Sequence, residues 1–109
     1  MIDQGPNGPF TIEQRDQSGA TVLVLTGELD AHSSRALAER IEGLLQQGQR
    51  SVAVDLADVG FVDSSGLRVL IRAHREFEDG NGSFRLRGAS PAFSRLVEIT
   101  GLSDLFVFE

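Results

Sequence analysis

Apolar residues along the chain repeat with two periods, one typical of β-strands and one of α-helices. Residues 10–15 alternate between apolar and polar, which predicts a half-buried strand. Residues 20–26 are almost wholly apolar, which predicts a strand covered on both faces. The Asp16–Gly19 segment between them has turn composition, so the two strands form a hairpin.

A helix and a further strand follow this hairpin. Gly27-Glu28-Leu29-Asp30 ends the second strand, and the helix is expected to begin at Ser33-Ser34 and to close at Gly48. Its apolar residues share one helical face; they are Leu37, Ile41, Leu44 and Leu45. Residues 52–56 form the next predicted strand, so residues 20–56 make a βαβ unit with a right-handed crossover.

The second half of the chain repeats the strand–helix order. After a short polar loop, a helix opens near Ser64 with an apolar stripe at Leu67, Leu70, Ile71 and Phe77. A strand over 83–87 precedes a third helix, which Ser90 caps before Pro91. Phe93, Leu96, Val97 and Thr100 are its predicted inner face, and residues 105–108 close the chain as a short strand.

The order β-β-α-β-α-β-α-β predicts an α/β fold. We expect a mixed sheet of four to five strands, with helices packed mostly on one face. The single domain covers residues 10–109 and follows an N-terminal tail over residues 1–9.

The βαβ geometry places loops that are distant in sequence at one edge of the sheet. Because the carboxyl ends of parallel strands share an edge, Asp30 and Ser33 should lie near Asp63, Ser64 and Ser65.

Asp63-Ser64-Ser65-Gly66 admits two interpretations. Asp and Ser are preferred N-cap residues, so the segment can be a helix cap alone. A helix N-terminus also carries free N–H groups and the positive end of the dipole, which stabilise a phosphate. Ser64 and Ser65 are therefore candidates for a switch as well.

Composition narrows the function. The chain has 16 acidic and 10 basic residues, all of the basic ones Arg, and neither Trp nor Tyr. A nucleic-acid binder would need a basic face and stacking aromatic residues, so a protein partner is favoured. The absence of Cys, of a signal peptide and of an apolar span predicts a cytoplasmic protein.

Catalytic chemistry finds no support in the sequence. His32 and His74 have no second ligand at metal spacing and are expected at the surface or rim. His74 lies nearly three helical turns from Ser64 and so cannot act as its base. Glu28 and Asp30 are more simply a polar strand end than an acid/base pair. We therefore expect no enzyme activity, no metal and no cofactor.

Several motifs together resemble a known family. Gly27-Glu28-Leu29-Asp30 after a strand, Phe61 to Leu67 opening a helix, Ser90-Pro91 and Gly101-Leu102 resemble the STAS domains. The resemblance is in particular to the bacterial anti-sigma factor antagonists, and it runs from about Thr11 to Phe108.

The resemblance implies a switch by partner exchange. In that family, the unphosphorylated antagonist binds an anti-sigma factor that is also a serine kinase, which frees the sigma factor for transcription. The kinase then phosphorylates the serine after the aspartate, here Ser64 with Ser65 as the alternative, and a serine phosphatase reverses this.

Partner-binding positions carry over residue by residue. They are Asp30, Ser33, Asp63, Ser64, Ser65, Gly66 and Arg68, although Arg68 replaces the small or apolar residue usual there. A weak homodimer is a further expectation. The alternative function is a STAS subunit of another assembly, such as a stressosome scaffold or the cytoplasmic partner of a lipid-transport ABC complex.

Overall fold

The computed structural model describes residues 9–109, and most of the predicted tail lies outside these residues. The described residues form five strands and three helices in the predicted order. In chain order they are β1 (Thr11–Gln17), β2 (Ala20–Leu29), α1 (Ala31–Gln46), β3 (Ser51–Val62), α2 (Ser64–Asp79), β4 (Ser83–Arg87), α3 (Pro91–Ile99) and β5 (Val107–Phe108).

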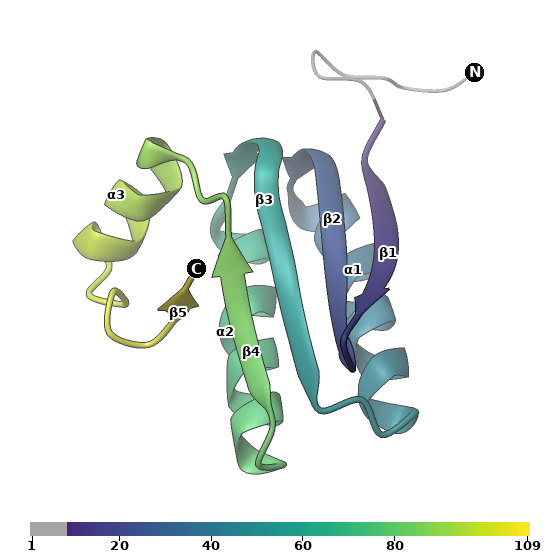
Figure 1. Ribbon diagram of the computed structural model, residues 1–109. Helices are drawn as coiled ribbons and strands as arrows, with labels where there is room; N and C mark the ends of the chain where they lie inside the picture. The colour runs from purple at the N-terminus through teal and green to yellow at the C-terminus, as the bar shows by residue number, and fades with distance from the viewer. Residues whose placement is uncertain (1–8) are drawn as a thin grey trace.

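The strands form one mixed sheet in the order β1-β2-β3-β4-β5 (Figure 1). β1 is antiparallel to β2, and all other neighbours are parallel. A tight turn at Ser18 and Gly19 joins β1 to β2, and both residues have positive φ angles of 53° and 83°. Two such angles are the signature of a hairpin turn that matches the twist of its strands.

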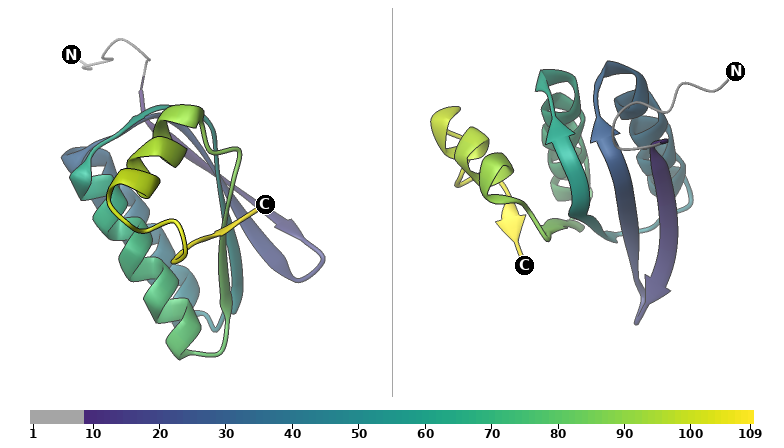
Figure 2. Two further views of the ribbon diagram at one scale, coloured as in Figure 1. Left: turned by 90° about the vertical axis from the view of Figure 1, so that its left-hand side faces the viewer. Right: turned by 90° about the horizontal axis from the view of Figure 1, so that it is seen from above.

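Helices α1 and α2 cover one face of the sheet, and α3 lies at the side of the sheet formed by β4 and β5 (Figure 2). The predicted α/β fold with helices mostly on one face is therefore confirmed. Leu23, Val52, Val54 and Leu70 are each 0% exposed in the core between sheet and helices. Ile71, which the helical stripe also assigned to the core, is only partly buried at its margin.

Strand β3 is more than twice as long as predicted, because residues 57–62 continue the strand instead of forming a polar loop. The β2/β3 register shifts between Val24 and Thr26 and again between Gly27 and Glu28. Each shift inserts one extra residue into β3, as a β-bulge does. The bulges break the period of two, which is why the sequence pattern ended the strand at Leu56.

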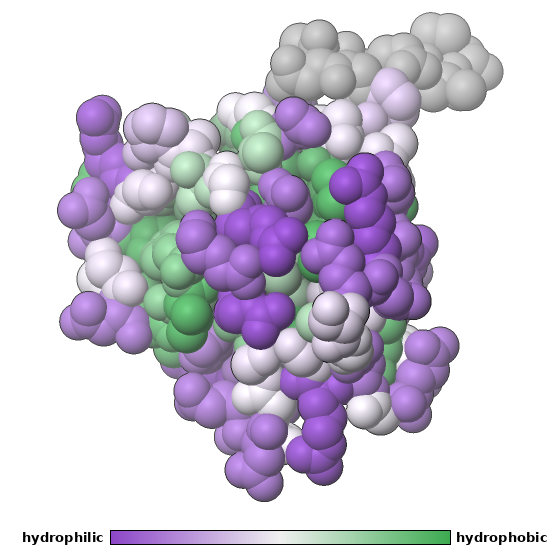
Figure 3. All heavy atoms as spheres, viewed as in Figure 1, coloured by the Kyte–Doolittle hydropathy of each residue, from purple (hydrophilic) through white to green (hydrophobic). Residues whose placement is uncertain are grey.

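The face of the sheet without helices is hydrophilic over its middle (Figure 3). Arg85 and Arg87 of β4 both bond the carboxylate of Glu109. On the edge strand, Arg15 bonds Glu13 at 2.9 Å. That hydrogen bond and the positive charge of Arg15 hold the pKa of Glu13 below its ordinary value. This face of the sheet therefore carries ion-paired side chains and is not covered by a second layer of helices.

Two side chains lie where the sequence did not predict them. His74 is buried with 6% exposure, not at the surface, and its ring meets the edges of Phe84 and Phe106. Its Nε2 is 3.4 Å from Glu78, while Nδ1 has no hydrogen-bond partner. Thr100 is exposed and caps the end of α3 by donating to the Leu96 and Val97 carbonyls.

The closing strand is also shorter than predicted. Only Val107 and Phe108 pair with β4, and Phe106 is instead buried against the core.

Candidate functional site

The carboxyl ends of β2 and β3 bring two helix N-termini side by side. The register pairs Leu29 with Val62, and the residue after each of them is the N-cap of a helix. The Asp63 N–H donates to the Leu29 carbonyl at 3.1 Å, which joins the two loops directly. As the βαβ geometry predicts, Asp30 and Asp63 therefore share one edge of the sheet.

Asp30 is the N-cap of α1, so the helix begins at Ala31 and not at Ser33 as predicted. Its Oδ1 accepts the N–H groups of His32 and Ser33 at 3.0 and 2.9 Å. The hydrogen bond from the Ser33 N–H is the largest of the interactions that hold the pKa of Asp30 below its ordinary value. Asp30 thus keeps a negative charge at this edge well into the acidic range.

Ser33 completes a capping box with Asp30 and is only 4% exposed. Its hydroxyl accepts the Asp30 N–H at 2.8 Å and donates to the Glu28 carbonyl at 2.6 Å. The side chain predicted to bind a partner therefore stabilises the loop that presents Asp30.

Asp63 caps the N-terminus of α2, as Asp30 caps that of α1. Its Oδ1 accepts the N–H groups of Ser65 and Gly66 at 2.8 and 3.1 Å. Two of the N–H groups that the sequence suggested for a phosphate are thus already bonded to a carboxylate. The cap is Asp63, and Ser64 is the first helical residue.

The two candidate serines differ in access. Ser64 is exposed, whereas Ser65 is half-buried. Neither hydroxyl forms a hydrogen bond with any residue between 9 and 109. Arg68 is exposed one turn further along α2 and forms no ion pair within that range. A phosphate on Ser64 would therefore meet solvent, the start of the helix dipole and the Arg68 guanidinium.

Gly66 is buried and fixes how closely α2 approaches the end of β2. A Cβ at this position would lie 2.7 Å from Cγ of Leu29 and 2.9 Å from its carbonyl oxygen. The absence of a side chain therefore sets the spacing between Asp30 and Ser64.

One exposed apolar residue at this edge was not predicted as part of the site. Phe61 is 50% exposed two residues before the cap. Beside it lies a cleft of about 110 Å³ between β3 and α3, whose lining includes Val59, Phe93 and Leu96. The sequence signal was available, because in a strand Phe61 points away from its neighbours Gly60 and Val62. The bulges hid that alternation.

Residues 9–109 hold no cluster of three or more His, Asp or Glu side chains arranged for a metal ion. None of the helices in this range is long and apolar enough to cross a membrane.

Comparison with protein families and solved structures identifies what the chain is similar to. The model of the family "Mlab, STAS domain" matches residues 12–107. An anti-sigma-B factor antagonist of Listeria monocytogenes is 33% identical over 99 residues, which covers 91% of this chain and 86% of that protein.

Two solved structures share the architecture. An anti-sigma factor antagonist from Mycobacterium paratuberculosis superposes with a TM-score of 0.82 at 26% identity, covering 92% of this chain and 85% of that one. The Bacillus cell fate determinant SpoIIAA in its phosphorylated form gives a TM-score of 0.73 at 25% identity, with 93% and 91% coverage.

Proposed function

Because this chain belongs to the STAS domain family, we propose that it is an anti-sigma factor antagonist controlled by phosphorylation of Ser64. Unphosphorylated, it binds an anti-sigma factor that is also a serine kinase. Phosphorylation releases that partner, and a serine phosphatase restores binding. The 33% identity to an anti-sigma-B factor antagonist supports the role of antagonist, and the structure of SpoIIAA in its phosphorylated form supports the modification.

The difference in exposure between the two serines supports Ser64 as the phosphorylated residue. Ser64 is exposed as the first residue of α2, beside the capped and acidic start of α1, whereas Ser65 is half-buried. A kinase needs to reach the hydroxyl oxygen, and exposure of Ser64 permits this without unwinding the helix. Asp30, Asp63 and Arg68 would form the surrounding partner surface, with Ser33 acting through Asp30 and Gly66 through the spacing between α2 and β2.

The same geometry explains how a phosphate would act on binding but not on folding. The phosphate adds a charge of about −1.5 to −2 at an edge that already carries Asp30 and Asp63. Within the chain, Arg68 and the helix dipole offset this charge. A partner fitted to the neutral serine has no such compensation, and a loss of about 3 kcal/mol lowers affinity roughly a hundredfold.

The test compares three variants with the cognate kinase and ATP. Ser64→Ala should bind the anti-sigma factor permanently, and Ser64→Asp should bind poorly. Ser65→Ala is the matched control and should still be phosphorylated and released. Mass spectrometry locates the phosphate, and calorimetry measures the affinity for the anti-sigma factor. Phosphate on Ser65 of the wild type, or equal affinity of the phosphorylated and unphosphorylated forms, would refute the mechanism.

A second candidate is a STAS subunit of another assembly, either a stressosome scaffold or the cytoplasmic partner of a lipid-transport ABC complex. The description of the matching family model, "Mlab, STAS domain", is the observation that supports this second candidate. A pull-down with the wild-type chain separates the two, since the first function recovers a serine kinase and the ABC-complex alternative a membrane ATPase.

A further inference from the structure

Among residues 9–109, no strand pairs with the outer edge of β1. In the described chain, β1 hydrogen-bonds only to β2, and its seven residues keep one continuous register without a bulge. Sheet edges in soluble proteins are usually blunted by short strands, proline, bulges, charged side chains or a covering element. β5 at the other edge has two residues, but β1 has seven, contains no proline, and of these protections carries only charged side chains, those of Glu13, Arg15 and Asp16.

The charges on β1 are arranged to complement a second copy of the same strand. Antiparallel pairing about a two-fold axis at Gln14 places Glu13 opposite Arg15 of the second copy, and Arg15 opposite its Glu13. Shifting the pairing by two residues in either direction places Glu13 opposite Glu13 or Arg15 opposite Arg15. Like charges directly opposite each other are destabilising, so the charge pattern selects one register.

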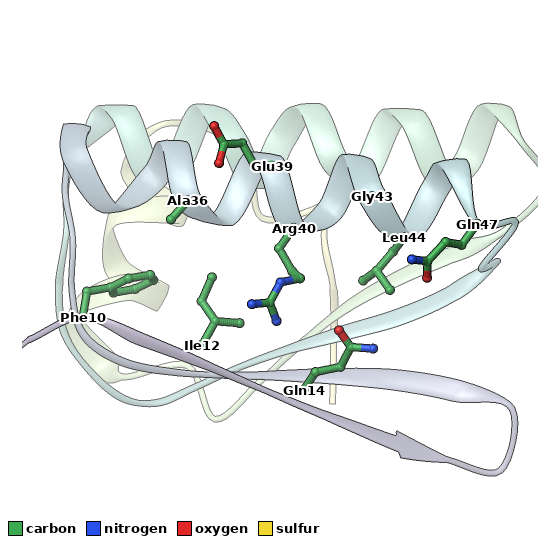
Figure 4. A pocket seen from close by; sticks show the side chains of 9 residues that line it. All are labelled: Phe10, Ile12, Gln14, Ala36, Glu39, Arg40, Gly43, Leu44 and Gln47. Carbon is green, nitrogen blue, oxygen red and sulfur yellow. The ribbon is translucent and has the colours of Figure 1, made fainter.

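The helix side of the edge offers a second complementary contact. A groove of about 550 Å³ runs between β1 and α1, and Arg40 points from α1 toward Ile12 and Gln14 of the strand (Figure 4). Arg40 has no ion-pair partner among residues 9–109. In the register centred on Gln14, Asp16 of the second copy lies opposite Ile12, beside this guanidinium.

We propose that the chain forms a two-fold homodimer by antiparallel pairing of β1 with β1, centred on Gln14. The sheet then continues through ten strands, with four alternating charges on its helix-free face. The interface is a strand of about 24 Å, so the dimer is weak and depends on concentration. Because the two copies run in opposite directions, each keeps its Ser64 edge free at opposite ends of the dimer.

Charge reversal tests the pairing. Sedimentation velocity across about 0.01 to 1 mM should show a monomer–dimer equilibrium for the wild type. Glu13→Arg and Arg15→Glu should each weaken the dimer by about tenfold or more, because each places two like pairs across the axis. An equimolar mixture of these two variants should dimerise again, since every cross-strand pair then has opposite charges. Glu98→Arg on the exposed side of α3 is the matched control and should dimerise like the wild type.

Cross-linking tests the register independently. The chain has no cysteine, so Gln14→Cys introduces a unique thiol on the axis, where opposite Cα atoms lie within disulfide range. Gln14→Cys should cross-link on mild oxidation, while Thr11→Cys should not, because the two Thr11 residues lie roughly 20 Å apart. A wild type that stays monomeric throughout, a dimer that both reversals leave intact, or cross-linking at Thr11 but not Gln14 would each overturn the proposal.

Discussion

Replacing Gly66 by alanine tests whether contact between α2 and β2 builds the candidate site. The new Cβ would lie 2.9 Å from the Leu29 carbonyl oxygen, a backbone atom that cannot rotate away. Ordinary contact begins near 3.4 Å, so α2 must move by several tenths of an ångström. That movement strains the hydrogen bond from the Asp63 N–H to Leu29 as well.

The expected loss follows from two opposing effects. Overpacking a rigid site costs about 1–3 kcal/mol, while alanine gains about 0.5–1 kcal/mol over glycine inside a helix. Gly66→Ala should therefore lower the free energy of unfolding by about 1 kcal/mol at the middle of both ranges, and by at most about 2.5 kcal/mol. Urea denaturation followed by circular dichroism measures the change, and affinity for the anti-sigma factor should fall in the same variant.

Gly43 provides the matched control for this substitution. It lies within α1, and a Cβ there would meet no atom within 4 Å. Gly43→Ala should stabilise the protein by about 0.5–1 kcal/mol through helix propensity alone. If Gly66→Ala proves as stable as Gly43→Ala, the close approach to Leu29 does not constrain the site.

Further expectations concern the core and the two caps. Leu70→Ala should cost about 2–5 kcal/mol in unfolding experiments, and Ile71→Ala clearly less, because Leu70 is 0% exposed and Ile71 only partly buried. Equal losses would contradict the helix orientation. The lowered pKa of Asp30 stabilises the fold above its ordinary value of 3.8, and this contribution is lost as pH falls through the folded pKa. Asp30→Asn still caps α1 but does not titrate, so its stability should fall less than that of the wild type between about pH 4 and pH 2, measured by thermal melts. Arg68→Ala should destabilise the Ser64-phosphorylated chain relative to its own unmodified form, since an i,i+4 pair is lost. The same change in melting temperature on phosphorylation in the wild type and the variant would remove Arg68 from that role.

Local patterns in the sequence were enough to predict the order of elements and the shared edge. Apolar periodicity identified every helix, and the βαβ rule brought Asp30 and Asp63 together across thirty residues. These features depend on neighbours in the chain or on a general rule of handedness, so no tertiary detail was needed.

The tertiary structure decided which residues within those elements are buried, which are exposed and which cap a helix. Two bulges in β3 lengthened the strand and exposed Phe61, because the register of a strand is fixed by its partner and not by its own composition. His74 became buried because the rings of Phe84 in the next strand and of Phe106 near the end of the chain pack against it. Asp30 and Asp63 became the N-caps of α1 and α2, with Ser33 completing the capping box at Asp30, because the backbone brings each carboxylate onto N–H groups of the first helical turn. The motif around Ser64 could therefore be recognised in the sequence, while its exposure depends on how closely Gly66 allows α2 to approach β2.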